Sequence, residues 1–225
     1  MRDRPIVFLV NGNSTEAVTS RLAGLARAVA PDFEILPSTT RDGPAYISTP
    51  SDVAVSADRI VAAIGRAVDE HGSEPACCII ACFGEPGLAE ARRRFRFPIV
   101  GLAEASFVTA LQLGGTFGIL TLGEHWPAML RDLVRQYGLQ DRCPAVQRVD
   151  GAPLDLIADP ALAARAVATA AAALGTPTVV LGGAALTGLV PRIGRLPGLR
   201  LVDCLHAALA QATALIEHAR MAGEP

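Results

Sequence analysis

The sequence predicts an α/β fold in which two pseudo-symmetric halves each build a parallel sheet with helices on both faces. Two observations support this prediction. Short apolar runs rich in β-branched residues alternate with longer Ala- and Leu-rich amphipathic segments along the 225 residues. The order of these patterns then repeats with a period of about 100 residues, which is typical of an internal duplication.

The individual elements follow from these patterns. The segments with the short apolar pattern of buried parallel strands are Ile6–Val10, Phe33–Leu36, Cys77–Ala81, Ile99–Leu102, Phe117–Leu120, Ala145–Val149, Thr178–Leu181 and Leu199–Val202. The segments between them with a helical pattern are Thr15–Ala30, Ser51–Glu70, Pro86–Phe95, Ala103–Leu113, Pro127–Tyr137, Pro160–Leu174, Leu186–Arg195 and Leu205–Met221. Asp159 before Pro160 is typical of a helix start, since Asp caps free amides and Pro suits the first turn.

Pairs of similar segments carry the repeat. The segment 117–121 mirrors 7–11, 177–189 mirrors 76–88, and 199–205 mirrors 98–104. The alternative is the loose periodicity that any α/β chain has. We expect one half at residues 1–104, completed by a C-terminal helix at 206–225, and a second half at 105–205. Two such halves would face each other across a cleft, where sites commonly form.

The charge composition excludes several kinds of chemistry. The formal net charge is −2, so no basic field indicates nucleic acid as a partner. All the Lys and Arg residues are Arg, and the chain has no Lys. A Schiff base to pyridoxal phosphate or to a carbonyl substrate needs a lysine amine, and a Walker P-loop needs its lysine, so both are excluded.

The apolar segments and the cysteines indicate the compartment. The run Ile6–Val10 is too short for a signal-peptide core or a membrane span, so we expect a cytoplasmic protein with no membrane partner. The five cysteines are an odd number without a CxxC pair, so a disulfide framework and a zinc site are not expected.

Cys82 is the first candidate for a reactive group. It follows the predicted strand Cys77–Ala81, and carboxyl ends of parallel strands are where α/β proteins bind ligands. Pro86 suits the first turn of a following helix, so we expect Cys82 just before a helix N-terminus. Free amides there would lower the pKa of the thiol towards neutrality and could hold a carboxylate or an enolate. A lone cysteine is nevertheless often an inert small hydrophobe.

The exit of the first strand is a second candidate. Asn11, Ser14 and Thr15 would form a polar cradle for a carboxylate or an amide, or Ser14 or Thr15 would simply cap the next helix. The segment is not GxGxxG, so no dinucleotide fingerprint is present. In the second half, Thr121 matches Asn11 and Gly183 matches Cys82, so that loop offers backbone amides but no acid or base.

On these residues the sequence resembles the aspartate/glutamate racemase superfamily, and most closely its hydantoin racemase branch. The resembling segments are 11–15, 43–45, 82–88, 98–105 and Thr121, and CFGEPGL at 82–88 is the most specific. The resemblance implies two Rossmann-like, three-layer αβα halves and a site without cofactor or metal. It also implies deprotonation next to a carbonyl by a thiolate, with reprotonation by a second thiol on the opposite face.

The sequence departs from that pattern at Gly183, where the second catalytic cysteine of the family would lie. Racemisation needs an acid/base on each face of a planar intermediate, because one base returns the proton to its original side. His125 or Glu124, which match Thr15 and Ser14, are possible substitutes, although His125 also reads as a helix-start residue. Single-cysteine arylmalonate decarboxylases in the superfamily suggest one-sided protonation instead, and a non-catalytic binding protein is a further alternative.

The resulting functional prediction is a racemase-type enzyme without cofactor. Cys82 carries the proton, and the loops at Asn11–Thr15, Phe83–Gly84, Thr121 and Gly183–Ala184 bind the substrate. The resemblance implies a small carboxylate or a hydantoin-type ring as that substrate. We also expect a homo-oligomer, since Ala-rich helices permit subunit contacts although they do not specify them.

Overall fold

The computed structural model describes residues 4–223 and divides them into two compact units. The first unit runs to Leu102 and also takes the chain from Leu205 onward, and the second unit is Ala103–Cys204. Each unit contains one four-stranded sheet.

The sheet of the first unit is parallel and has the strand order β2-β1-β3-β4. Its strands are β1 (Ile6–Asn11), β2 (Glu34–Thr39), β3 (Cys77–Ile80) and β4 (Ile99–Gly101). The central strands are apolar on both sides, since Val7 to Val10 and Cys77 to Ile80 are all buried. A strand buried on both faces needs helices above and below it, as the continuous apolar runs predict.

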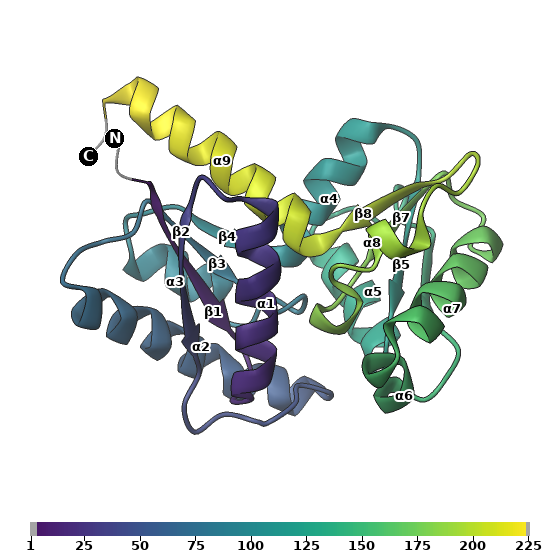
Figure 1. The fold of residues 1–225 in the computed structure, drawn as a ribbon, viewed down its shortest axis with the longest axis horizontal. Helices are drawn as coiled ribbons and strands as arrows, with labels where there is room; N and C mark the ends of the chain where they lie inside the picture. The colour runs from purple at the N-terminus through teal and green to yellow at the C-terminus, as the bar shows by residue number, and fades with distance from the viewer. Residues whose placement is uncertain (1–3, 224–225) are drawn as a thin grey trace. The chain divides into compact units, whose positions relative to one another are not determined.

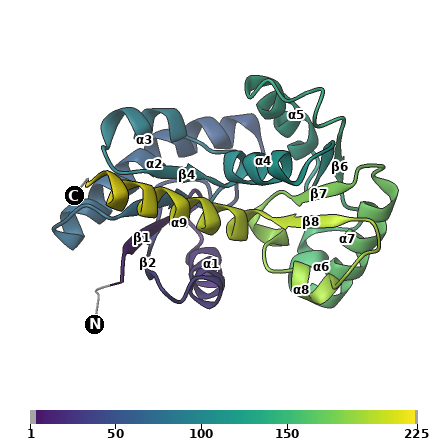
Figure 2. The same cartoon turned by 90° about the horizontal axis from the view of Figure 1, so that it is seen from above.

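The helices of the first unit are α1 (Glu16–Val29), α2 (Pro50–His71), α3 (Leu88–Arg94) and α9 (Cys204–Ala222). The helix α1 lies on one face of the sheet, and α2 and α3 lie on the other (Figures 1 and 2). Both β1–α1–β2 and β3–α3–β4 are parallel crossovers, which a parallel sheet requires. This arrangement brings the carboxyl ends of β1 and β3 to the same edge.

The second unit repeats the topology with the order β6-β5-β7-β8. Its strands are β5 (Phe117–Thr121), β6 (Ala145–Arg148), β7 (Thr178–Leu181) and β8 (Arg200–Asp203). Its helices are α4 (Leu102–Leu113), α5 (Trp126–Gln136), α6 (Pro153–Ala158), α7 (Pro160–Ala173) and α8 (Val190–Ile193), with a 3₁₀ turn η1 at Ala184–Leu186. The predicted cap at Asp159 is confirmed, since its Oδ1 accepts hydrogen bonds from the amides of Ala161 and Leu162 at 2.9 and 3.0 Å.

The two units match strand for strand, so the predicted fold class of two similar α/β halves is confirmed. An equivalent hydrogen bond follows the last residue of β3 in the first unit and of β7 in the second unit. The Ala81 amide donates to the Val10 carbonyl at 2.8 Å, and the Gly182 amide donates to the Leu120 carbonyl at 2.8 Å. The next residues, Cys82 and Gly183, therefore occupy equivalent positions at the ends of β3 and β7.

Two predicted helices had wrong bounds, and one helix was missed. The helix expected from Pro86 begins at Leu88, because Glu85 and Gly87 have φ of 52° and 75° and break the regular backbone. The helix expected over Leu186–Arg195 is only the short α8, since Gly188 and Gly194 have φ of 81° and 72°. The helix α6 was not predicted. No helix among residues 4–223 is long and apolar enough to cross a membrane.

Candidate active site

Cys82 lies at the end of β3, where the sequence places it, and its side chain is 9% exposed. The thiol packs against the loop that follows β1. A Cβ added at Gly12 would lie 3.0 Å from Cys82 Cβ and 3.2 Å from Ile47 Cδ1, which is tighter than an ordinary contact. Glycine at position 12 therefore lets the loop after β1 and the chain near Ile47 close over the cysteine.

The electrostatics of Cys82 differ from the prediction. The backbone amides of Gly84 and Glu85 donate hydrogen bonds towards the sulfur and lower the pKa of the thiol, as expected for a turn rich in free amides. Burial outweighs them and, with the negative charge of Glu85, raises the pKa of Cys82 from 9.0 to about 11. The expected shift towards neutrality was therefore wrong. The helix α3 begins only at Leu88, so its N-terminus does not adjoin the sulfur.

Glu85 is a buried carboxylate that the sequence analysis did not single out. Its side chain is 7% exposed, and its backbone adopts a left-handed φ of 52°. Its amide donates to the Cys82 carbonyl at 3.0 Å. A Cβ at Gly101, the last residue of β4, would clash with the Glu85 carboxylate. Glycine at position 101 therefore leaves the space that the carboxylate occupies.

Asn11 organises the loop after β1 from within. Its Nδ2 donates to Asn13 Oδ1 and to Thr19 Oγ1, each at 3.0 Å, and its Oδ1 accepts from the Asn13 amide at 3.2 Å. Asn13 Oδ1 in turn accepts from the amide of Thr15 at 3.0 Å. The side-chain amide of Asn11, which is 2% exposed, is thus used by the protein itself.

Ser14 and Thr15 hold the segment that joins β2 to α2, which we call the strap (residues 40–49). The Ser14 Oγ donates to the Gly43 carbonyl at 3.1 Å, and the Thr15 Oγ1 donates to the Ala45 carbonyl at 2.6 Å. Neither hydroxyl caps α1, so the capping interpretation was wrong. Their hydroxyl hydrogens are committed to the strap, and only their oxygen lone pairs remain for a ligand.

The other end of the strap is held by Asp52. Its Oδ2 accepts from the amides of Ser48 and Thr49 at 2.9 and 2.8 Å and from the Ser48 hydroxyl at 3.1 Å. With the Asp52 amide donating to Thr49 Oγ1, this forms a capping box at the start of α2. The strap is therefore tied at both ends, with Tyr46 and Ile47 between the two ties.

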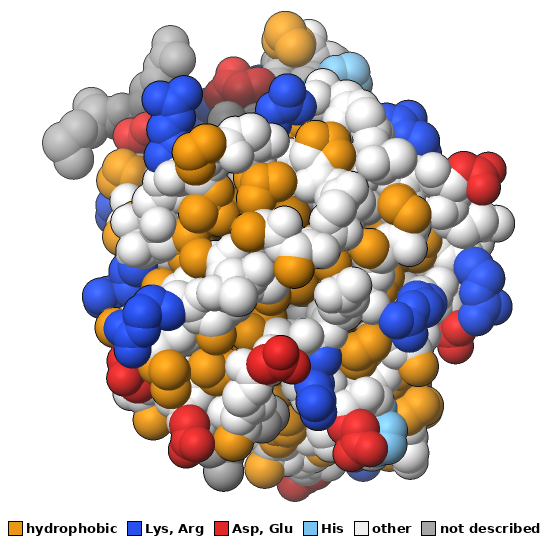
Figure 3. All heavy atoms as spheres, turned by 90° about the vertical axis from the view of Figure 1, so that its right-hand side faces the viewer, with side chains coloured by type: hydrophobic (Ala, Val, Ile, Leu, Met, Phe, Trp, Pro, Cys, Tyr) orange, Lys and Arg blue, Asp and Glu red, His pale blue; other side chains and the backbone are white. Residues whose placement is uncertain are grey.

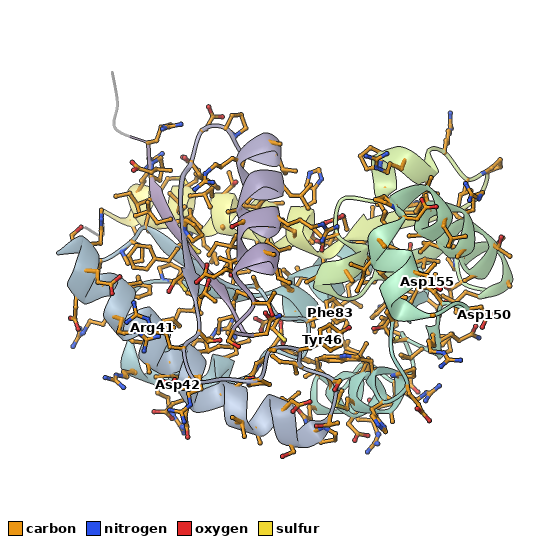
Figure 4. All side chains as sticks on the ribbon, turned by 60° about the horizontal axis from the view of Figure 1, so that its bottom comes forward. Arg41, Asp42, Tyr46, Phe83, Asp150 and Asp155 are labelled. Carbon is orange, nitrogen blue, oxygen red and sulfur yellow. The ribbon has the colours of Figure 1, made fainter. Side chains whose placement is uncertain are left out.

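Tyr46 lies on the strap near Cys82, and the sequence analysis did not select it. Burial of the ring and the charge of an ionised Cys82 both raise the pKa of the Tyr46 hydroxyl. In Figure 4, Tyr46 and Phe83 lie at the same end of the first unit. The signal available in the sequence was an aromatic residue directly after the resembling segment 43–45, inside a loop of small polar residues.

The second unit carries no thiol at the equivalent position. Gly183 has φ of 134°, a conformation that residues with a side chain rarely adopt, and the nearest atom to an added Cβ would be Thr121 Oγ1 at 4.0 Å. The Gly183 carbonyl accepts from the Leu186 amide at 3.0 Å and from Thr187 Oγ1 at 3.3 Å. The buried Cys204 thiol lies behind this carbonyl at 4.0 Å, and burial raises its pKa to about 12.

The proposed substitutes for a second acid lie at a helix start. Glu124 and His125 are exposed and directly precede α5. His125 occupies the N-cap position without a side-chain hydrogen bond to the helix. The arrangement fits the helix-start interpretation of His125, and a role in proton transfer remains a prediction.

One cavity of the second unit carries no group for proton transfer. A cavity of about 360 Å³ in the second unit is lined by Ala161, Ala164, Arg165, Ala168, Arg192 and Ile193, none of which exchanges protons at neutral pH. Figure 3, which faces the side of that unit where α7 lies, shows apolar side chains among scattered charges. Within residues 4–223, no three His, Cys, Asp or Glu side chains gather as metal ligands would.

Comparison with known proteins gives consistent similarities. The model of the Asp/Glu/hydantoin racemase family matches residues 7–212. A hydantoin racemase of Rhizobium meliloti is 30% identical over 215 residues, which cover 93% of this chain and 88% of that protein. A solved allantoin racemase from Klebsiella pneumoniae has a TM-score of 0.85 at 29% identity, covering 98% of this chain and 89% of its own. A mutant of arylmalonate decarboxylase, with a TM-score of 0.69 at 15% identity over 94% of this chain and 92% of its own, shows likeness of fold alone.

Proposed function

The chain belongs to the Asp/Glu/hydantoin racemase family, and we propose that it transfers a proton at the carbon next to a carboxylate or carbonyl group, using Cys82 and no cofactor. One observation carries this proposal. Cys82 lies at the end of a central strand, and hydrogen bonding by the backbone amides of Gly84 and Glu85 lowers the pKa of its thiol against the effect of burial. Such donors stabilise the thiolate that remains after the proton has left.

The proton balance of this step is simple. In one direction, Cys82 Sγ–H gives its proton to the carbon of an enolate, and the sulfur becomes a thiolate held by the two amides. In the other direction, the thiolate takes the proton from that carbon, and the electron pair of the C–H bond moves into the carbonyl system. With a pKa of about 11, the resting group near neutral pH is the thiol, which suits the first direction.

The substrate is proposed from the relatives. The two racemases compared above are named for hydantoin and allantoin. Allantoin and 5-substituted hydantoins are small cyclic amides with a stereocentre beside a ring carbonyl. We propose a small cyclic amide of this kind or a small carboxylate as the substrate. The assignments of Asn11, Ser14, Thr15, Phe83, Gly84, Thr121, Gly183 and Ala184 to substrate binding remain part of this proposal.

The position of Gly183 favours an alternative within the same family. Because the residue equivalent to Cys82 has no side chain, no second thiol is available there, and a single acid/base returns the proton to one side only. A decarboxylase or isomerase that protonates an enolate on one face needs no second thiol. A protein that binds such molecules without converting them is the remaining alternative.

The test is proton NMR in heavy water with hydantoins, allantoin, amino acids and malonates. Exchange of the Cα proton with inversion supports racemisation, exchange with retention supports a one-sided base, and release of carbon dioxide from a malonate supports the decarboxylase. Each activity should be lost in Cys82→Ser and kept in Cys143→Ser, a buried cysteine of the second unit. Activity that survives Cys82→Ser would contradict the proposal, and binding without any turnover would favour the non-catalytic alternative.

A further inference from the structure

Two strap hydroxyls make no hydrogen bond within the described residues: Thr40 Oγ1, which is fully buried, and the hydroxyl of Tyr46, which lies near Cys82. Among the described residues, the hydroxyl of Tyr46 has no hydrogen-bond partner, whereas Ser14, Thr15, Ser48 and Thr49 all use their hydroxyls within the protein. The Tyr46 side chain is 47% exposed, so water or a ligand can reach it.

The backbone on either side of Tyr46 is held by hydrogen bonds. The Ala45 carbonyl on one side is held by Thr15, and Ser48 on the other side is held by Asp52. Ile47, the next residue, is 5% exposed and packs towards Gly12, against which Cys82 also packs. Because this short segment is tied at both ends and anchored by a buried Ile, the backbone that carries Tyr46 is held in place, and less of it has to be ordered when a ligand binds.

The chemistry of this pair is complementary. A phenol that remains protonated is a hydrogen-bond donor, and both burial and an ionised Cys82 keep the Tyr46 hydroxyl protonated. In the proposed reaction, the Cys82 sulfur exchanges a proton with a carbon of the substrate. As the enolate forms, the oxygen of the neighbouring carbonyl group gains negative charge. A donor placed near the sulfur can stabilise that oxygen.

We propose that Tyr46 is a substrate-contacting residue whose hydroxyl donates a hydrogen bond to a carboxylate or carbonyl oxygen of the molecule that reacts at Cys82. This inference rests on the proposed function, because it takes Cys82 as the reacting group. The Tyr46 hydroxyl is a donor from the strap, which is separate from the loops at the ends of β1 and β3.

The test uses two reagents for the Cys82 thiol and does not require turnover. Iodoacetate forms an S–C bond and releases iodide, and it brings a carboxylate next to the sulfur. Methyl methanethiosulfonate forms a disulfide, releases methanesulfinate and brings no carboxylate. Tyr46→Phe keeps the ring and removes only the hydroxyl, and it should slow the reaction with iodoacetate about three- to tenfold while changing the other rate less than about twofold.

The matched control is Tyr137→Phe, since Tyr137 is the other tyrosine of the chain and lies at the end of α5. It should leave both rates unchanged. Equal slowing of both reagents in Tyr46→Phe would indicate a change at the sulfur itself and would overturn the inference. Unchanged rates, or a Cys82 that reacts with neither reagent, would overturn it as well. Activity surviving in Cys82→Ser would instead refute the proposed function, so the two failures are distinguishable.

Discussion

The protonation state of Cys82 is open to a direct measurement. Raising the pKa of a thiol from 9.0 to about 11 is a change of two units, and each unit reduces the thiolate fraction tenfold below the pKa. At a pH near 8, Cys82 in the folded protein should therefore react with iodoacetamide about a hundred times more slowly than an ordinary cysteine does. The physical reason is that burial disfavours the charged thiolate more than the amides of Gly84 and Glu85 favour it.

The assay follows the rate of alkylation against pH, with peptide mass analysis to identify the modified cysteine. The unfolded protein in guanidinium chloride supplies the ordinary rate, and Cys82→Ser supplies the background from the buried cysteines. A midpoint near 11 agrees with a resting thiol that donates its proton. A midpoint at or below about 8 would refute the reasoning, because the amides would then outweigh burial and Cys82 would rest as the thiolate that a proton-abstracting base requires.

Three further substitutions have defined outcomes. Glu85→Gln removes a charge that raises the pKa of Cys82, so the alkylation midpoint should fall but stay above 9.0, since burial is the larger cause. Gly183→Cys places a side chain in open space but on a backbone with φ of 134°, so it should lower the free energy of unfolding by about 1–3 kcal/mol. The added thiol should also introduce exchange with inversion in the NMR assay. Asp52→Ala should cost about 1 kcal/mol at neutral pH, because it removes the capping box that ties the strap.

Two of these substitutions have a matched control variant, and Asp52→Ala is checked by its pH dependence. Glu90→Gln removes an exposed carboxylate on α3 and should not move the alkylation midpoint of Cys82. Gly183→Ala should show the cost in stability without inversion, and equal stability in both variants and the native protein would contradict the strain.

Hydrogen bonds lower the pKa of Asp52 below its ordinary 3.8, so the contribution of Asp52 to the free energy of unfolding is present above that value and is lost as pH falls through the lowered pKa. A difference in the free energy of unfolding between Asp52→Ala and the native protein that persists at a pH below the lowered pKa of Asp52 would contradict this.

The order of the elements and the equivalence of Cys82 and Gly183 were available from the sequence. Strand and helix patterns are local, because burial on both faces of a strand selects an apolar run such as Cys77–Ile80 whatever lies further away. The similarity of segment 177–189 to 76–88 then identifies the duplication without any coordinates. The exact course of the chain after Cys82 was beyond such reasoning, since the left-handed turn at Glu85 follows from packing against Gly101.

The sequence alone identified Cys82 and the loop after β1 as candidate groups, whereas the tertiary structure added Glu85 and Tyr46 and decided how each side chain behaves. The raised pKa of Cys82 depends on segments far away in the chain, among them the loop after β1, which no local pattern reveals. The commitment of Ser14 and Thr15 to the strap depends on carbonyls about 30 residues further along. Periodicity reports the side on which a residue is buried, whereas solvation and hydrogen bonding are sums over all the segments that fold around it.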